Sequence, residues 1–384
     1  MIGVDVESLL ARVARLGLAR HVLRRVERAG HMDKVNVAVI GTGWCGGIRA
    51  VASAASPWVN DLHIAEINQD RLREVASLTK PVTATTDYRQ LLEIDSIHAV
   101  MICTTPEPTH FPIAKESMLA GKHVLLEKPI ALDLSEADEL IALSKERNLA
   151  FTIGYSQRFN PKFAYVKRSI EDGTIGEPVT ALVSRHITRN LGSKIGGRVK
   201  LSPAAMEATH DIDFVLWCLA PRKPVRVYAQ EVKKIMRPQY SVPDCVWMIV
   251  TMNDGTAFTI GAGWVLPPAY PNFSSTWIEF VGTEGAVMVD DTHRDVYVTT
   301  VQQGIRFPIS SMPGEKINHV YAGPMEAETL HFLECIALGR QPLVTAEHAR
   351  MVMQLYMAAD RSAETNQPVS LTIKDELSLA GTSG

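Results

Sequence analysis

The chain has 384 residues, more than one ordinary hydrophobic core accommodates, so two domains are expected. It is 46% hydrophobic and 21% charged, as globular proteins are, and no apolar run approaches the roughly 20 residues of a membrane-spanning helix, so no membrane partner is expected. A net charge of −3 disfavours nucleic acid as a partner, and five scattered cysteines without a CxxC pair predict no disulfide frame, no metal site and a reducing, cytoplasmic setting.

Residues 1–32 are predicted to form an N-terminal helical arm. Apolar residues recur there near helical spacing among six arginines, which indicates a basic amphipathic helix. Asp5, Glu7 and Glu27 argue against a transit peptide, because such leaders are poor in acidic residues. We expect a surface arm or a subunit contact.

Residues 33–154 alternate short β-branched runs with longer helical stretches, which is the pattern of βαβ units. The predicted strands are Val35–Ile40, Leu62–Ile67, Val82–Ala84, Ala99–Cys103, Val124–Leu126 and Ala150–Ile153. The helical stretches between them include Gln69–Ser77, Thr109–Ala120 and Ser135–Asn148. This order predicts an α/β fold in which a doubly wound, parallel Rossmann sheet binds a dinucleotide.

Residues 155–372 are predicted to form a second α/β domain, followed by a tail at 373–384. Runs that alternate apolar and polar residues are joined there by tight turns, of which Asn253-Asp254-Gly255 is a hairpin signal. The predicted strands are Val225–Val232, Cys245–Met252, Ala257–Trp264, Trp277–Val281, Ala286–Val289 and Val296–Thr300. With closing helices at Pro324–Leu338 and Ala346–Thr365, the pattern predicts a large, mostly antiparallel sheet.

A glycine-rich loop follows the first strand and opens a helix. In Gly41-Thr42-Gly43-Trp44-Cys45-Gly46 the first glycine permits the turn, the second the approach of a pyrophosphate, and the third close packing of helix and strand. The helix N-terminus attracts the phosphate charge. Glu66, twenty residues later, can accept hydrogen bonds from the adenosine ribose and repel a 2′-phosphate, so NAD is favoured over NADP.

Glu127-Lys128-Pro129 follows the fifth predicted strand. Ligands of open α/β sheets bind at the carboxyl ends of strands, so Lys128 can face a cofactor and stabilise a developing alkoxide. A lone lysine after a strand is more often solvated surface.

His210 lies in the segment Glu207-Ala208-Thr209-His210-Asp211-Ile212-Asp213. Its imidazole can titrate near neutral pH, and Asp213, three residues on, can share its helix face, so the pair could shuttle a proton. The alternative is a helix-start cluster in which His210 is merely packed.

Two further segments are open to a functional and a structural interpretation. The basic, glycine-rich loop from Arg189 to Ser202 is either a closing lid or a solvated loop. Trp264 is either an apolar wall against a sugar or part of the core.

Several motifs together resemble the Gfo/Idh/MocA oxidoreductases. They are Ala120-Gly121-Lys122-His123-Val124-Leu125-Leu126-Glu127-Lys128-Pro129, Thr105-Pro106 with His110, Gly154-Tyr155-Ser156-Gln157-Arg158-Phe159-Asn160-Pro161, and Gly282-Thr283-Glu284-Gly285. The resemblance runs from Val35 to about Leu371. It implies a Rossmann domain, then a domain whose open sheet packs against a neighbouring subunit in a homodimer or homotetramer.

The resemblance also implies roles for individual residues. It implies that Lys128 is the catalytic lysine, that His210 is the acid/base residue and that Arg158 lies near the nicotinamide and the substrate. We also expect Thr209, Asp213 and Trp264 near the substrate. The cofactor residues expected are Gly41, Gly43, Trp44, Cys45, Gly46, Glu66, Thr105, His110 and Glu127, with Glu127 also fixing Lys128.

The chain departs from its relatives at three positions. Met206 stands where many polyol dehydrogenases have an aspartate four residues before the histidine, with Glu207 displaced by one position. Glu107 replaces the usual asparagine after Thr105-Pro106, and Trp44 is a bulky entry to the glycine loop.

The expected activity is hydride transfer between NAD and a secondary alcohol or ketone of a sugar, cyclitol or sugar derivative. One alternative is a redox-neutral lyase or glycosidase that retains NAD, and another is a non-catalytic NAD- or sugar-sensing regulator, for which Met206 is the best support. A nucleic-acid-binding role for the arginine-rich arm is weakest.

Overall fold

The structure is a computed structural model that describes residues 34–196, 200–290, 298–302, 304–306, 316–317, 320–321 and 323–372. The predicted arm at 1–32 and tail at 373–384 lie outside the described residues. Among the helices within these ranges, none has the length and apolar content that a bilayer crossing requires.

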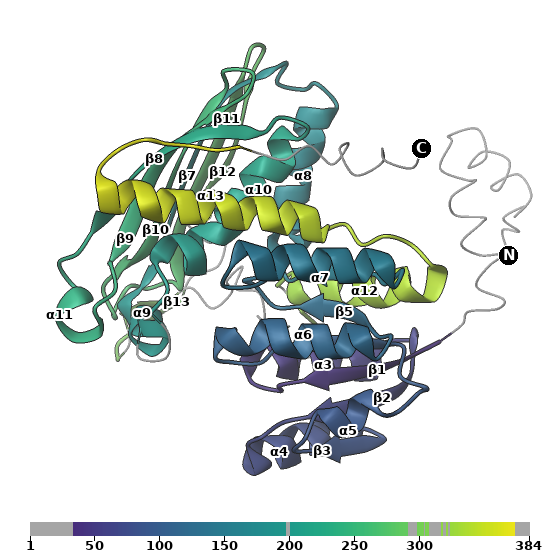
Figure 1. The fold of residues 1–384 in the computed structure, drawn as a ribbon. Coiled ribbons are helices and arrows are strands. Elements are labelled where there is room, and N and C mark those ends of the chain that lie inside the picture. Colours follow the sequence, from purple (N-terminus) through teal and green to yellow (C-terminus); the bar gives the residue numbers. More distant parts are fainter. Residues whose placement is uncertain are drawn as a thin grey trace, which may run out of the picture.

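The first sheet is parallel, with strand order β3-β2-β1-β4-β5-β6 (Figure 1). Its strands are β1 (Val35–Ile40), β2 (Val59–Ala65), β3 (Thr83–Thr85), β4 (Ala99–Ile102), β5 (His123–Leu126) and β6 (Phe151–Ile153). Between them lie α3 (Trp44–Ala55), α4 (Gln69–Thr79), α5 (Arg89–Leu92), the short η2 (Glu107–Thr109), α6 (His110–Leu119) and α7 (Leu134–Glu146). The predicted doubly wound sheet is confirmed.

The switch in strand order falls beside β1. Strand β2 pairs with one edge of β1 and β4 with the other, so the loops after β1 and β4 diverge there. Ligands of such sheets bind in the crevice outside these carboxyl ends. The glycine loop, which follows β1, therefore starts at this crevice.

The second sheet has the order β12-β11-β7-β10-β9-β8-β17 and is antiparallel except where β10 pairs with β7. Its strands are β7 (Pro178–Thr188), β8 (Pro224–Val232), β9 (Cys245–Met252), β10 (Ala257–Leu266), β11 (Ser274–Gly282), β12 (Ala286–Asp290) and β17 (Val369–Ser370). The predicted antiparallel sheet is confirmed. The long central strand β7 is not among the strands predicted above.

Two small hairpins lie outside both large sheets. They are formed by β13 (Val298–Thr300) with β14 (Gly304–Arg306), and by β15 (Lys316–Ile317) with β16 (Val320–Tyr321). The predicted strand Val296–Thr300 thus survives as β13, and its first two residues lie outside the described residues.

Helices cover one face of the second sheet (Figure 1). The chain enters this region through η3 (Ser156–Phe159) and α8 (Pro161–Glu171) and continues through α9 (Arg189–Gly196), η4 (Ala204–Ala208), α10 (Thr209–Leu219), α11 (Arg237–Tyr240), α12 (Met325–Leu338) and α13 (Ala346–Thr365). Helix α10 packs on β7, α8 on β12, and α13 on β8.

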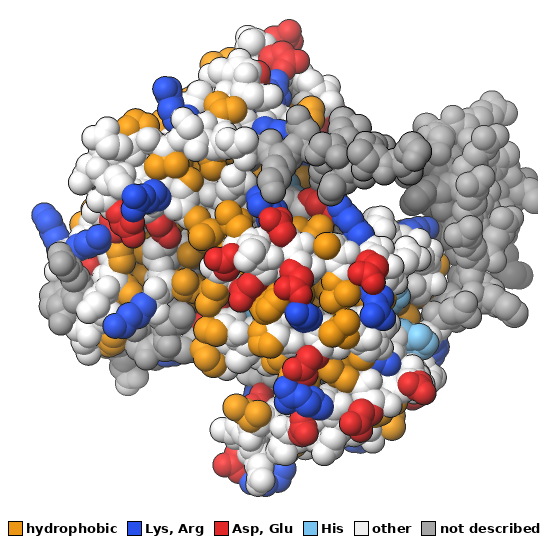
Figure 2. Space-filling model, viewed as in Figure 1, with side chains coloured by type: hydrophobic (Ala, Val, Ile, Leu, Met, Phe, Trp, Pro, Cys, Tyr) orange, Lys and Arg blue, Asp and Glu red, His pale blue; other side chains and the backbone are white. Residues whose placement is uncertain are grey.

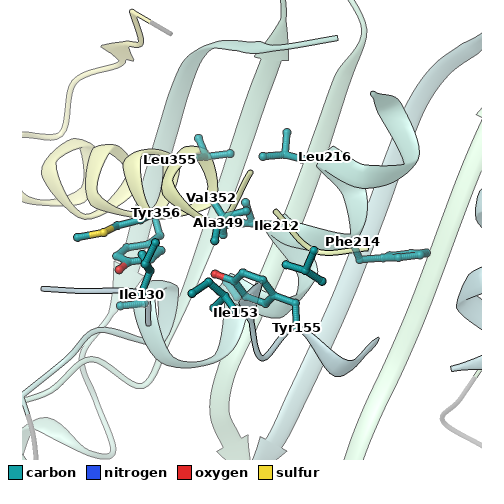
Figure 3. Close-up of a cluster of buried hydrophobic side chains, with 14 of the residues drawn as sticks. Ile130, Ile153, Tyr155, Ile212, Phe214, Leu216, Ala349, Val352, Leu355 and Tyr356 are labelled. Carbon is teal, nitrogen blue, oxygen red and sulfur yellow. The ribbon is translucent and has the colours of Figure 1, made fainter. Parts of the chain in front are cut away.

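One hydrophobic cluster joins the two sheets (Figure 3). Ile153 and Tyr155, which close the first sheet, meet Ile212 of α10 and Val352 of α13 within it. Burial of each such side chain contributes on the order of 2 kcal/mol. The shared core fixes α10, and so His210, relative to the parallel sheet.

Helix α12 returns to the first sheet although it lies late in the chain. It packs against α3 and β1, and Phe332 and Leu333 join Val37 and Val39 in a second cluster.

Figure 2 shows positively and negatively charged side chains scattered over the face drawn in Figure 1, without a large patch of one sign.

Candidate active site

The glycine loop has the geometry of an anion-binding turn. A Cβ on Gly41, whose φ is +81°, would lie 2.9 Å from the carbonyl oxygen of Cys103, and one on Gly46 would lie 1.8 Å from the oxygen of Gly41. Around Gly43 there is open space for 4 Å. These three positions therefore meet the needs that the motif implies: a positive φ, close packing, and room for a ligand.

Helix α3 begins without a side-chain cap. Gly43 at its N-cap makes no side-chain hydrogen bond, and its first turn has no acidic residue, whereas Asn68 caps α4 and Asp133 caps α7. The first N–H groups of a helix need a partner, and the positive end of the helix dipole favours an anion. The residues present thus fit the pyrophosphate of a dinucleotide.

Glu66 lies at the mouth of this loop. Its carboxylate accepts hydrogen bonds from Thr42 N at 2.7 Å, Thr42 Oγ1 at 3.2 Å and Asn68 N at 3.0 Å. Arg71 of α4 holds the same loop, since its Nε donates to Thr42 O at 2.6 Å and its Nη2 to Gly43 O at 3.1 Å. Arg71 was not predicted, because nothing in the periodicity of α4 marks one arginine as a loop ligand.

Trp44 and Cys45 open α3. The indole of Trp44 is 52% exposed, so it is free to cover a ligand in the loop. Burial, followed by the nearby charge of Glu127, raises the pKa of the Cys45 thiol to about 12. Cys45 is therefore a neutral packing group at neutral pH.

The motif Thr105-Pro106 with His110 forms the wall after β4. Thr105 is exposed, while His110 is buried, with Nδ1 2.8 Å from Pro129 O and Nε2 3.0 Å from Thr104 O. His110 therefore ties the loop after β4 to the loop after β5.

Glu127 pairs with Arg49 rather than with Lys128. Arg49 Nε and Nη2 lie 3.0 and 2.6 Å from Glu127 Oε1, and Nη2 also lies 2.7 Å from Glu328 Oε2 of α12. The expected contact between Glu127 and Lys128 is therefore replaced by a Glu127–Arg49 pair. The fully buried guanidinium of Arg49 needs carboxylate partners. Burial, first of all, raises the pKa of Glu328 to about 7.

Lys128 reaches across to the second sheet's helices. Its Nζ donates a hydrogen bond of 2.8 Å to the carbonyl oxygen of Met206, in η4. The side chain is partly exposed, so its remaining N–H groups can meet a ligand. Lys128 thus stands between the carboxyl edge of the Rossmann sheet and the turn that precedes His210.

His210 begins α10 and is partly exposed, with its ring 6.1 Å from that of Tyr155. Its Nδ1 is buried and has no hydrogen-bond partner among the described residues. Burial, Lys128 and Arg185, in that order, lower the pKa of His210 well below 6.5. The imidazole is therefore neutral at pH 7, the state that accepts a proton.

The expected pairing of His210 with Asp213 is wrong. Asp213 is fully buried and forms two hydrogen bonds with Arg158, from Nε at 3.0 Å and Nη2 at 2.6 Å, while His348 Nε2 lies 3.2 Å from it. Burial opposes ionisation of Asp213, but Arg158 and His348 together lower its pKa. His210 is partly exposed at the start of α10, whereas Asp213, on the same helix, points inward. There it pairs with the guanidinium of Arg158.

Arg158 is consequently a residue of the domain junction. It is 4% exposed, donates to Leu343 O at 3.2 Å and lies over the ring of Trp217 at 5.2 Å. Thr209 is also buried, with Oγ1 2.9 Å from Tyr155 Oη. Their places differ from the ligand-facing ones expected, because each satisfies a buried partner instead.

Trp264 belongs to the core, which was the second of the two interpretations offered from the sequence. Its side chain is 0% exposed, its Nε1 donates to Glu207 Oε1 at 2.8 Å, and a Cβ on Gly192 would lie 2.6 Å from it. The predicted loop at 189–202 begins instead as helix α9, which covers this indole; residues 197–199 lie outside the described ones. Trp264 therefore forms no open wall.

Arg185 of β7 lies behind this region and was not predicted. Its Nε is 2.9 and 3.0 Å from the two carboxylate oxygens of Asp211, and its Nη1 is 3.4 Å from Glu207 Oε2. The signal in the sequence is that Arg185 occupies an inward position of a strand whose other inward residues are Ala181, Val183 and Ile187.

Comparisons with known proteins agree with this architecture. The family described as "Oxidoreductase family, NAD-binding Rossmann fold" matches residues 35–155, and its partner, "Oxidoreductase family, C-terminal alpha/beta domain", matches residues 167–371. The chain is 27% identical to scyllo-inositol 2-dehydrogenase (NAD(+)) of Bacillus subtilis, over 89% of this chain and 97% of that protein.

The similarity extends to a second sequence relative and to a solved structure. UDP-N-acetylglucosamine 3-dehydrogenase of Acidithiobacillus ferrooxidans is 26% identical over 85% of this chain and 99% of its own length. The solved structure of scyllo-inositol dehydrogenase from Lactobacillus casei, with bound NAD(H) and scyllo-inositol, has a TM-score of 0.77 at 20% identity, covering 88% of this chain and 99% of that one. That structural likeness extends the agreement to the fold.

Proposed function

The chain belongs to the Gfo/Idh/MocA family of oxidoreductases with an NAD-binding Rossmann domain, and on that premise we propose that it oxidises a secondary alcohol of a cyclitol or sugar, or reduces the ketone. The observation that carries the proposal is the position of Lys128. Its Nζ, at the end of β5, bonds to the carbonyl of Met206, four residues before a neutral His210. The names of the relatives support cyclitols and sugars as the substrate class.

The chemistry is divided between the cofactor and the chain. NAD, when bound, supplies the hydride acceptor. The glycine loop and the uncapped N-terminus of α3 would hold its pyrophosphate, and Glu66 would hold its ribose. His210, neutral at pH 7, takes the hydroxyl proton, and the ammonium of Lys128 stabilises the developing alkoxide.

The test is the formation of reduced nicotinamide, followed by absorbance, with NAD or NADP and a panel of inositols, hexoses, sugar acids and nucleotide sugars. We expect turnover with one group, and a loss on the order of 100-fold or more in Lys128→Met and His210→Gln. Lys115→Met, at a partly exposed position, and His98→Gln, at an exposed one, are the matched controls and should keep full activity.

Two outcomes would contradict the proposal. Full activity in folded Lys128→Met and His210→Gln would remove the assigned roles. Tight NAD binding without net reduced nicotinamide would instead favour a redox-neutral enzyme if glycosides are cleaved, and a sensor if they are not.

The exposed face of the second sheet is proposed as the homo-oligomer interface. Trp247, Ile249, Tyr228, Leu182 and Met288 all expose large apolar surfaces there, on the side away from α10 and α13. The Trp247 ring lies flat over Gly261, where a Cβ would be 2.4 Å from it. Although Thr259 and Glu279 lie between some of them, this many large apolar side chains on one sheet face favour a second copy as the proposed cover.

A cytoplasmic setting remains the proposed compartment. All five cysteines are free thiols, and four of them are buried, which suits a reducing environment.

A further inference from the structure

The turn before His210 departs from α-helical geometry. Residues Ala204–Ala208 form a π-helix, a rare element that concentrates at functional sites. In a regular α-helix the carbonyls of Met206 and Glu207 would face the N–H groups of His210 and Asp211. Here each carbonyl meets a cationic side chain: Lys128 Nζ bonds to Met206 O at 2.8 Å, and Arg185 Nη2 bonds to Glu207 O. Two cations from different sheets thus hold consecutive carbonyls of one turn.

Arg185 makes more of these contacts than any lysine could. Its Nε lies 2.9 and 3.0 Å from the two oxygens of Asp211, its Nη1 3.4 Å from Glu207 Oε2, and its Nη2 holds Glu207 O. Trp264 Nε1 fixes the other Glu207 oxygen at 2.8 Å. A planar guanidinium presents its donors in a fixed fork, whereas an ammonium is a point charge. Arg185 therefore sets the path of the backbone on both sides of Ala208.

We propose that Arg185 is a positioning residue of the active site, which holds the π turn so that Met206 O receives Lys128 and His210 stays in the cleft. Arg185 touches neither substrate nor cofactor in this assignment and acts through Glu207 and Asp211. The catalytic roles of Lys128 and His210 rest on the proposed dehydrogenase function. The position of the turn does not depend on that function.

The charge of Arg185 also acts on His210. The charged or titratable groups near this imidazole are Lys128 from the end of β5, Arg185 from β7, Tyr155 from the domain junction, Glu207 of the π turn and its own neighbour Asp211. Lys128 and Arg185 both favour the neutral ring. Loss of the guanidinium therefore removes one of the two charges that lower the pKa of the His210 imidazole.

Two variants separate position from charge. Arg185→Lys keeps a cation but loses the fork, and Arg185→Gln removes the charge. Arg222→Gln is the matched control, because Arg222 also pairs with two carboxylates, Glu177 and Asp254, but at the protein surface. Each is compared with the wild-type chain by thermal unfolding, by NMR titration of the His210 imidazole, assigned with His210→Gln, and by kcat, KM and the pH profile of kcat/KM.

For Arg185→Lys we expect kcat to fall about 10- to 100-fold, with the KM for NAD within about twofold of wild type. For Arg185→Gln we expect the His210 titration and the acid limb of kcat/KM both to move to higher pH. Arg222→Gln should change neither readout. A merely structural arginine would lower the unfolding temperature, while Arg185→Lys kept the wild-type kcat and the wild-type His210 titration.

Wild-type kcat in Arg185→Lys, or an unmoved His210 titration in folded Arg185→Gln, would overturn the inference. If Arg185→Gln does not fold, the kcat of Arg185→Lys decides alone. If no substrate turns over in the wild type, the dehydrogenase proposal fails by itself, and the NMR titration still decides the role of Arg185.

Discussion

Cofactor preference is decided by single residues at the glycine loop. Glu66 offers a carboxylate where a 2′-phosphate would lie, and the sequence spacing alone indicates this. The structure adds Arg71, whose guanidinium holds Thr42 O and Gly43 O beside it. A cation this close weakens the repulsion that Glu66 exerts on a phosphate, so the preference for NAD rests on the balance of two charges.

We therefore expect Glu66→Gln to narrow the preference. Loss of the carboxylate removes the repulsion and leaves Arg71 to attract a phosphate, so the ratio of the NADPH to the NADH dissociation constant should fall about tenfold or more. Binding can be followed by quenching of the fluorescence of Trp44, at the loop. The control is Glu74→Gln, which removes the surface partner 2.8 Å from Arg71 and leaves Glu66 in place. An unchanged ratio in Glu66→Gln would assign the preference elsewhere.

At the scale of single elements, helix α13 packs against the π turn at Ala204–Ala208. Asp360 on this helix accepts a 2.9 Å hydrogen bond from Ser202 Oγ, and the same hydroxyl accepts from Ala205 N at the start of the turn. The other oxygen of Asp360, Oδ1, has no hydrogen-bond partner among the described residues. Burial, above all, raises the pKa of Asp360 from 3.8 to about 7.

The raised pKa makes stability depend on pH in a definite direction. Between pH 4 and pH 7 the unfolded chain ionises this carboxyl while the folded chain keeps its proton, so stability falls as pH rises and levels off above about pH 7. Asp360→Asn should abolish this loss, giving a gain in unfolding free energy at pH 8 over pH 5 on the order of 2–4 kcal/mol relative to wild type. Urea titrations at several pH values measure it.

The control for Asp360→Asn is Glu364→Gln, one turn later on the exposed side of α13. Glu364 is one of the weaker causes of the raised pKa of Asp360, so this variant should reduce the pH dependence of stability far less than Asp360→Asn does. A Glu364→Gln effect as large as that of Asp360→Asn would show that general charge on α13, and not the buried carboxyl, sets the dependence.

At the scale of the whole molecule, α12 joins a late segment of the chain to the end of β5. Glu328 on α12 and Glu127 at the end of β5 share the buried guanidinium of Arg49, at 2.7 and 2.6 Å. Although burial opposes it, the two carboxylates raise the pKa of Arg49 above its ordinary value. The contact spans 279 residues of sequence, so it forms only when both parts of the chain are folded.

Arg49→Met should therefore destabilise the protein strongly. It leaves two buried carboxylates without a cation, which costs about 3–5 kcal/mol at pH 8 and less at pH 5, where a buried carboxyl with a raised pKa holds its proton. Glu328→Gln, the matched control, keeps the Arg49–Glu127 pair and should change the unfolding free energy by no more than about 1 kcal/mol. Equal effects of both variants in denaturant unfolding would contradict this account.

Assembly is also a property of the whole molecule. If the open face of the second sheet pairs with a second copy, Ile249→Lys in its exposed centre should yield monomers, since a buried unpaired charge opposes association. Light scattering after size-exclusion chromatography measures the mass. The control is Tyr165→Lys on α8, where Tyr165 is 62% exposed against 53% for Ile249 but lies on another element. A wild-type mass for Ile249→Lys would exclude this face as the interface.

The sequence by itself determined the parallel sheet, the antiparallel sheet, the glycine loop with Glu66, and Lys128 at the end of β5. Each is set by local pattern: β-branched runs, tight turns, and a motif of fixed spacing between a strand and a helix. The same local reasoning could place His210 at the start of a helix but not choose its neighbours.

Only the tertiary structure decided which charges meet. Asp213 was expected beside His210 and pairs with Arg158, Glu127 was expected to hold Lys128 and pairs with Arg49, and Arg185 was not expected at all. The physical reason is that a buried charge is stable only with a partner of opposite sign, and that partner is set by packing between distant segments rather than by spacing along the chain.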